Sequence, residues 1–157
     1  MMILTYLILL FIAFLGVFIG LVIGYFTQEE LQPGMNYFNI FRHLLFVAIL
    51  IIFFVKNPSI PFIIFIALLI IIYSLSSYRE TLYYYSLAVI FFMAWLFNGF
   101  ALVAPLIFLY GFPLGTIYLQ EHITIKKKKK KIILGALKQY VGFLVVGALL
   151  GLLGLFL

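Results

Sequence analysis

The chain has 157 residues, of which 68% are hydrophobic and only 9% are charged, and its formal net charge is +6. Soluble domains average about 25% charged residues, so this composition excludes a soluble globular protein. It predicts an all-α, polytopic transmembrane helical bundle that forms a single domain over residues 1–157. Because cysteine and aspartate are absent, disulfides, thiolate chemistry and sites built on paired aspartates are also excluded.

Six apolar segments are candidates for membrane-spanning helices, since a bilayer core of about 30 Å needs about 20 helical residues. The first carries no charge and no signal-peptide cleavage site, so we expect a retained helix. The polar stretch that starts at Thr27 ends it, and Pro33 with Gly34 predicts a turn before the second segment. The six spans are expected near residues 3–26, 37–56, 60–77, 82–97, 100–119 and 132–157.

The apolar stretch 82–119 is too long for one crossing, because it would form a helix of about 57 Å. We expect it to break at Asn98-Gly99, which gives two spans. The alternative is a break at Pro105, which makes 106–119 a re-entrant half-helix and leaves five spans. In either case Pro105 and Pro113 are expected to kink the helix that contains them.

The positive charges predict the orientation of the bundle, because cytoplasmic loops carry an excess of Lys and Arg. With six spans both termini lie on one face, and Arg42, Arg79 and the lysine run 126–131 lie on the other, against Lys56 alone. We therefore expect the lysine face to be cytoplasmic and both termini to lie outside, in the cytoplasmic membrane of a prokaryote. Five spans would place Arg79 opposite the lysines.

Glycines are expected to mark the faces where helices touch, since small residues let backbones approach each other in lipid. The first, fifth and last spans are rich in glycine and alanine, so we expect them to form the centre. The second and third, rich in large apolar residues, are expected at the rim. Packing within the chain competes with homo-oligomerisation or docking of a protein partner through the same faces. The glycines concerned are Gly16, Gly20, Gly24, Gly111, Gly115, Gly147 and Gly151.

A run of six lysines is the strongest local signal. Lysines beside a membrane helix attract anionic lipid headgroups at about 1 kcal/mol each. We therefore expect the run to anchor the topology and to bind membrane lipid, with an acidic protein segment as the alternative partner and no nucleic acid. The lysine run consists of Lys126, Lys127, Lys128, Lys129, Lys130 and Lys131.

Other titratable residues are expected at or near the same face. Two glutamates with two histidines are able to hold a metal or to act as acid and base. We favour the simpler interpretation that they are solvated interfacial residues, and we predict no catalytic residue, no metal site and no cofactor. Tyr83, Tyr84 and Tyr85 resemble part of an aromatic belt. The interfacial cluster consists of Glu29, Glu30, Arg42, His43, Glu121 and His122.

The shortage of polar groups in the spans favours a non-enzymatic membrane component, a scaffold or an accessory subunit of a membrane complex with a basic cytoplasmic loop. The first alternative is a transporter or channel subunit whose pore forms on oligomerisation. It would need Asn98, the tyrosines and the proline-containing span to converge. The second alternative is an interfacial lipid-modifying enzyme that uses Glu29, Glu30, His43 and His122.

Overall fold

The computed structural model describes residues 2–56, 79–97, 99–123 and 129–154, and every regular element in these ranges is an α-helix. The expected third span, residues 60–77, lies outside the described residues. The helices are α1 (Met2–Phe26), α2 (Gln28–Lys56), α4 (Arg79–Leu96), α5 (Phe100–Ile123) and α6 (Lys129–Leu153).

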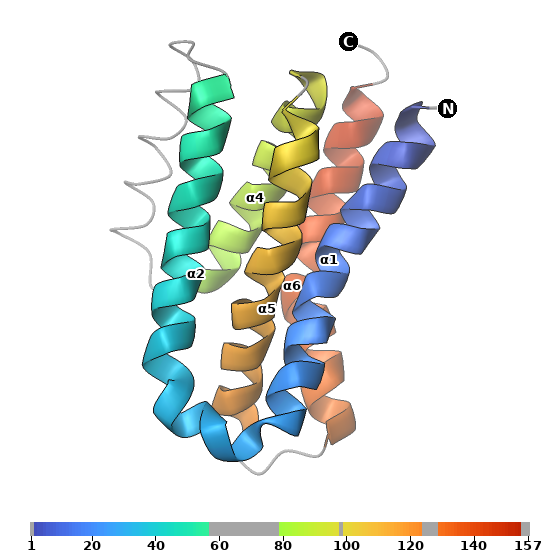
Figure 1. Ribbon diagram of the computed structural model, residues 1–157. Helices are drawn as coiled ribbons and strands as arrows, with labels where there is room; N and C mark the ends of the chain where they lie inside the picture. Colours follow the sequence, from blue (N-terminus) through green and yellow to red (C-terminus); the bar gives the residue numbers. More distant parts are fainter. Residues whose placement is uncertain (1, 57–78, 98, 124–128, 155–157) are drawn as a thin grey trace.

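The helices stand side by side as an upright bundle (Figure 1). α1 and α5 run downward in this view, whereas α2, α4 and α6 run upward. The start of α1, the end of α2 and the end of α6 therefore lie at one end of the bundle. The end of α5 and the starts of α2 and α6 lie at the other end, which we call the basic end because the lysine run enters α6 there.

Four of the helices are long and apolar enough to cross a membrane, over Ile3–Phe26, Pro33–Lys56, Phe100–Ile123 and Lys130–Leu153. The apolar part of α4, Thr81–Leu96, is shorter. Large apolar side chains also cover much of the outer surface of the bundle: Leu4, Val47 and Leu149, for example, are all at least half exposed. These features are compatible with a protein embedded in a membrane.

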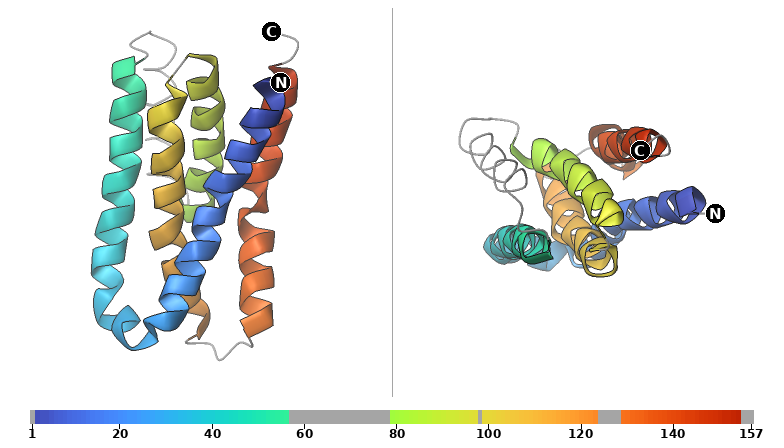
Figure 2. Two further views of the ribbon diagram at one scale, coloured as in Figure 1. Left: turned by 45° about the vertical axis from the view of Figure 1, so that its right-hand side comes forward. Right: turned by 90° about the horizontal axis from the view of Figure 1, so that it is seen from above.

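The expected turn at Pro33-Gly34 is wrong, because both residues lie inside α2. The chain turns at Thr27 instead, whose N–H and hydroxyl both donate to the carbonyl oxygen of Ile23, each at 3.1 Å. Proline is tolerated here because it gives up only the hydrogen bond to Glu29, within the first two turns of the helix. These first turns lie across the basic end before the helix turns upward (Figures 1 and 2).

The long apolar stretch after residue 82 is divided at residues 97–99, between the end of α4 and the start of α5. The Gly99 N–H donates to the carbonyl oxygen of Ala94 at 3.0 Å, and the Gly99 carbonyl accepts the N–H of Val103 at 3.3 Å. Gly99 thus closes one helix and opens the next. α5 then continues unbroken through Pro105 and Pro113, so the structure has no helix boundary at Pro105.

The contact between α1 and α5 is the most extensive in the bundle, and glycines on both helices form it. A side chain at Gly16 would overlap the backbone of Phe108, and one at Gly20 would overlap the backbone of Phe112. On the opposing helix, Cβ atoms at Gly111 and Gly115 would meet the backbone of α1. Backbone therefore lies directly on backbone, the close packing that small residues permit between membrane helices.

The middle of the bundle is made by α4 and α5, with α2 on one side and α1 and α6 on the other (Figure 2). In the most apolar stretch of each helix, 56% of the residues of α5 are buried, whereas 28% are buried in α2 and in α6. The last helix is therefore as peripheral as α2, which differs from the expectation that its glycines put it in the centre. Its glycines instead admit side chains: Gly147 receives Leu10, and Gly151 receives the ring of Tyr6.

Candidate functional site

Side-chain hydrogen bonds tie the helices together inside the bundle, and one of them joins Gln139 on α6 to Thr81 on α4, where Nε2 donates to Oγ1 at 3.3 Å. The Tyr6 hydroxyl on α1 donates to the carbonyl oxygen of Gly147 on α6 at 2.8 Å. The Tyr85 hydroxyl on α4 donates to the carbonyl oxygen of Gln139 on α6 at 2.7 Å. Thr116 Oγ1 on α5 lies 3.0 Å from the carbonyl oxygen of Gly20 on α1, and 3.0 Å from that of Phe112 in its own helix.

An aromatic cluster fills the centre, and it includes a tyrosine that was expected in an interfacial belt. Tyr84 is fully buried, with its ring stacked on Phe143 at 4.6 Å and against the edge of Tyr140 at 5.6 Å. Its hydroxyl has no hydrogen-bond partner among the described residues. Tyr83 and Tyr85 are half-buried. Helical spacing explains the difference, because three consecutive residues point in directions about 100° apart.

The predicted interfacial cluster comes from two helices, α2 and α5. Glu29 is exposed at the start of α2, whereas Arg42 and His43 lie about four turns farther along that helix. Glu121 and His122 lie at the end of α5. Among the described residues, no group of three or more His, Asp or Glu side chains is placed to hold a metal ion.

Both histidine rings are engaged by their own helices. Nδ1 of His43 lies 2.6 Å from the carbonyl oxygen of Asn39, and Nδ1 of His122 lies 2.9 Å from that of Tyr118. In each case Nδ1 must carry the proton that is donated to the carbonyl. The His122 ring also stacks on Tyr118, with ring centroids 4.0 Å apart. These contacts hold the two rings against helix backbone, on different helices.

The lysine run leads into α6 at the basic end. Lys126, Lys127 and Lys128 lie outside the described residues, and α6 begins at Lys129. Lys130 and Lys131 are exposed, and the next residue, Ile132, is buried. The positive charges thus stand directly beside an apolar part of the bundle.

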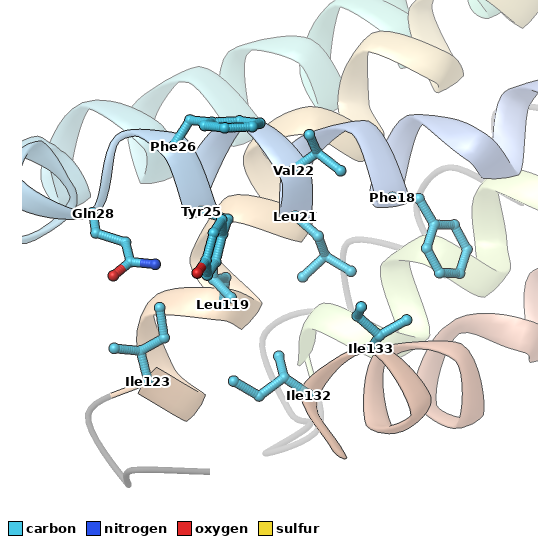
Figure 3. Close-up of a pocket in the computed structure, with 10 residues that line it drawn as sticks. All are labelled: Phe18, Leu21, Val22, Tyr25, Phe26, Gln28, Leu119, Ile123, Ile132 and Ile133. Carbon is cyan, nitrogen blue, oxygen red and sulfur yellow. The ribbon is translucent and has the colours of Figure 1, made fainter. Parts of the chain in front are cut away.

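That apolar part is a groove of about 590 Å³ between α1, α5 and α6 (Figure 3). Its floor is made by the buried side chains of Leu21, Leu119 and Ile132. Its rim includes Val22 and Phe26, which are exposed. The remaining lining residues are Phe18, Tyr25, Gln28, Ile123 and Ile133.

Polar groups of the groove lie toward one end. The side chains of Tyr25 and Gln28 stand next to each other at the last turn of α1 and the start of α2, while Phe18 lines the far end (Figure 3). Lys130 precedes Ile133 by three residues, so the two side chains lie on one face of α6. The groove therefore has an apolar length with polar groups at one end, and it lies beside the lysines in the first turn of α6.

The sequence offered some signal for this site, since glycines and lysines flank it, but the groove residues themselves were not predicted. Leu21, Leu119 and Ile132 resemble any other apolar residue, and only the packing of three helices brings them together. Comparisons with protein-family models, with curated proteins and with solved structures find no match for this chain.

Proposed function

We propose that this chain is a multi-pass protein of the cytoplasmic membrane that acts as a non-enzymatic scaffold or accessory subunit. The observation that carries the proposal is the packed interior. Between α1 and α5 backbone lies on backbone at Gly16 and Gly111, and aromatic rings such as Tyr84 and Phe143 fill the centre. A bundle packed in this way has its binding surfaces on its outer faces and at its ends.

Six spans are part of the proposal. α2 and α4 run in the same direction (Figure 1). Two successive parallel helices need a return crossing between them, and the sequence 60–77 is apolar enough to supply it. The sixth crossing would be α4, whose apolar part is short but whose inner face is buried among other helices.

The basic end is proposed to face the cytoplasm and to bind anionic lipid headgroups. Lys130 and Lys131 are exposed there, and four more lysines precede them in the sequence. At the opposite end of the bundle, α2 ends at Lys56, which is exposed. The excess of lysine on one side supports this orientation.

Native mass spectrometry of the protein, extracted gently from its own membranes, tests the assignment as an accessory subunit. We expect a stable complex with a second polypeptide that keeps its stoichiometry at increasing collision energy. A chain that appears only alone or with copies of itself would contradict the assignment. A Gly34→Ala variant is a suitable control for substitution as such, because among the described residues a Cβ there would meet the ring of Phe38 alone.

Substitution of the two histidines separates this function from an interfacial enzyme. Because both rings bond to carbonyls of their own helices, we expect His43→Ala and His122→Ala to leave complex formation and growth of the host unchanged. A change in the lipid composition of the host membrane with either variant would favour the enzyme instead.

A further inference from the structure

The groove between α1, α5 and α6 stands next to the strongest positive charge in the chain. We propose that it binds one phospholipid with an anionic headgroup, which places an acyl chain along Leu21 and Leu119 and its phosphate against Lys130 and Lys131. This inference rests on the proposed membrane location and adds to it a defined site and a defined class of ligand.

The shape of the groove fits a chain-like apolar ligand. Its volume of about 590 Å³ lies within the range of small-molecule sites, roughly 300–1,000 Å³. The floor is buried and wholly apolar, and the exposed rim residues Val22 and Ile133 stand on different helices, on either side of it (Figure 3). An acyl chain held here would contact α1, α5 and α6 at the same time.

The polar end of the groove fits a lipid headgroup. Tyr25 and Gln28 supply a hydroxyl and an amide at this end, and each is able to donate a hydrogen bond to an ester or phosphate oxygen. Lys130 and Lys131 add positive charge in the first turn of α6, where the helix dipole also favours an anion. The same end carries Glu29 and Glu121, and in the sequence four further lysines directly precede Lys130.

Charge must decide which lipid is bound. Lipid tails in a bilayer are as apolar as the groove, so burial of the chain gives little preference by itself. A lysine near the headgroup favours an anionic over a zwitterionic lipid by about fivefold. The site should therefore distinguish phosphatidylglycerol from phosphatidylcholine, although both have the same acyl chains.

Fluorescence quenching by lipids with brominated acyl chains tests this directly. Trp95 is the only tryptophan of the chain, so Trp95→Phe gives a silent background. Val22→Trp then reports on the groove, and Ile23→Trp is its matched control. Both positions are exposed, at 54% and 40%, and lie at the same depth on α1, but only Val22 lines the groove.

We expect brominated phosphatidylglycerol to quench Val22→Trp with a relative binding constant about 30-fold above that of brominated phosphatidylcholine, since each of the two lysines contributes about fivefold. The ratio should be near one for Ile23→Trp. Adding Lys130→Gln and Lys131→Gln should bring the Val22→Trp ratio toward one, whereas Lys138→Gln, farther along α6, should leave it unchanged.

Equal quenching by the two lipids at Val22→Trp would overturn the groove site and leave the membrane location intact. Absence of quenching at both tryptophans would overturn the membrane location and the groove site together. Because a tryptophan at Val22 adds bulk to the rim, native mass spectrometry of the unmodified chain in mixed vesicles gives an independent measurement. We expect one retained phosphatidylglycerol, lost in the Lys130→Gln, Lys131→Gln variant, and retention of both lipids in proportion to their abundance would contradict the proposal.

Discussion

At the scale of single residues, the hydroxyl groups of two buried tyrosines are expected to change the stability of the fold in opposite directions. Tyr6 and Tyr84 are both fully buried, but the Tyr6 hydroxyl bonds to Gly147 and that of Tyr84 has no partner among the described residues. We expect Tyr6→Phe to lower stability by about 1 kcal/mol, because it removes a buried hydrogen bond. Tyr84→Phe should raise it by up to about 1 kcal/mol, because it removes an unpaired polar group.

The two variants control each other, since the chemical change is the same. The measurement is the thermal unfolding midpoint in detergent, followed by far-ultraviolet circular dichroism, where about 1 kcal/mol corresponds to roughly 2–4 °C. A loss of stability in Tyr84→Phe equal to that in Tyr6→Phe would mean that the Tyr84 hydroxyl has a partner.

Thr116 offers a second prediction at this scale. Its hydroxyl lies within 3.0 Å of the Gly20 carbonyl across the α1–α5 contact, so we expect Thr116→Val to lower stability by about 0.6 kcal/mol, the mean for interhelical hydrogen bonds in membranes. Thr27→Val is the control, because that hydroxyl bonds to a carbonyl one turn before it, at an end of the bundle. An equal loss in both would show that the contact between the helices contributes nothing specific.

At the scale of helices, the glycines differ in what surrounds them. The loss of stability on substitution by alanine should therefore differ from one glycine to the next. A Cβ at Gly111 would lie 2.6 Å from backbone atoms of Gly16 and Val17, which cannot move without separating the two helices. We expect Gly111→Ala and Gly16→Ala to lower the free energy of unfolding by at least about 2 kcal/mol, toward the upper end of the range for overpacking.

Gly24 and Gly34 complete this series. At Gly24 the neighbours are side-chain methyl groups of Leu119 and Thr116 at 3.0 and 3.3 Å, so Gly24→Ala should be milder. At Gly34 the Phe38 ring is the one described neighbour, and Gly34→Ala should raise the free energy of unfolding by roughly 0.5–1 kcal/mol through helix propensity. Similar losses at Gly16 and Gly34 would contradict direct backbone contact between α1 and α5.

Helix boundaries show which parts of the fold are determined by the local sequence. Asn98-Gly99 was expected to divide the stretch 82–119, and α4 and α5 meet there, because Gly99 satisfies backbone groups of both helices. Pro33 with Gly34 was expected to form a turn but lies inside α2, because a proline in the second turn of a helix removes only the hydrogen bond to the residue four positions before it. α5 likewise continues through Pro105 and Pro113, so none of these three prolines marks a helix boundary.

Helix packing was harder to predict from the sequence than helix boundaries. Glycine content placed the last helix in the centre, but α4 occupies that place, with Leu87, Ala88 and Phe91 fully buried. A glycine shows only that something approaches closely, and on α6 these are the side chains of Leu10 and Tyr6 rather than another backbone. The groove escaped prediction for the same reason, since its lining residues belong to four helices and share no local pattern.

At the scale of the whole molecule, the two ends of the bundle should lie on opposite sides of a membrane. Absence of cysteine from the chain lets single cysteines report accessibility without background labelling. Glu29→Cys and Glu121→Cys lie at the basic end, and Lys56→Cys lies at the other end; all three positions are exposed. The two glutamate positions leave every lysine of the basic end in place, so the charge that sets orientation is not weakened.

In intact cells, we expect a membrane-impermeant maleimide to label Lys56→Cys and to leave both glutamate variants unlabelled until the membrane is permeabilised. Labelling of all three from one side would contradict a chain that crosses the membrane. The reversed pattern would keep the crossing but invert the orientation. In that case the lysines would face away from the anionic cytoplasmic leaflet, and the groove would have to take its lipid from the opposite leaflet.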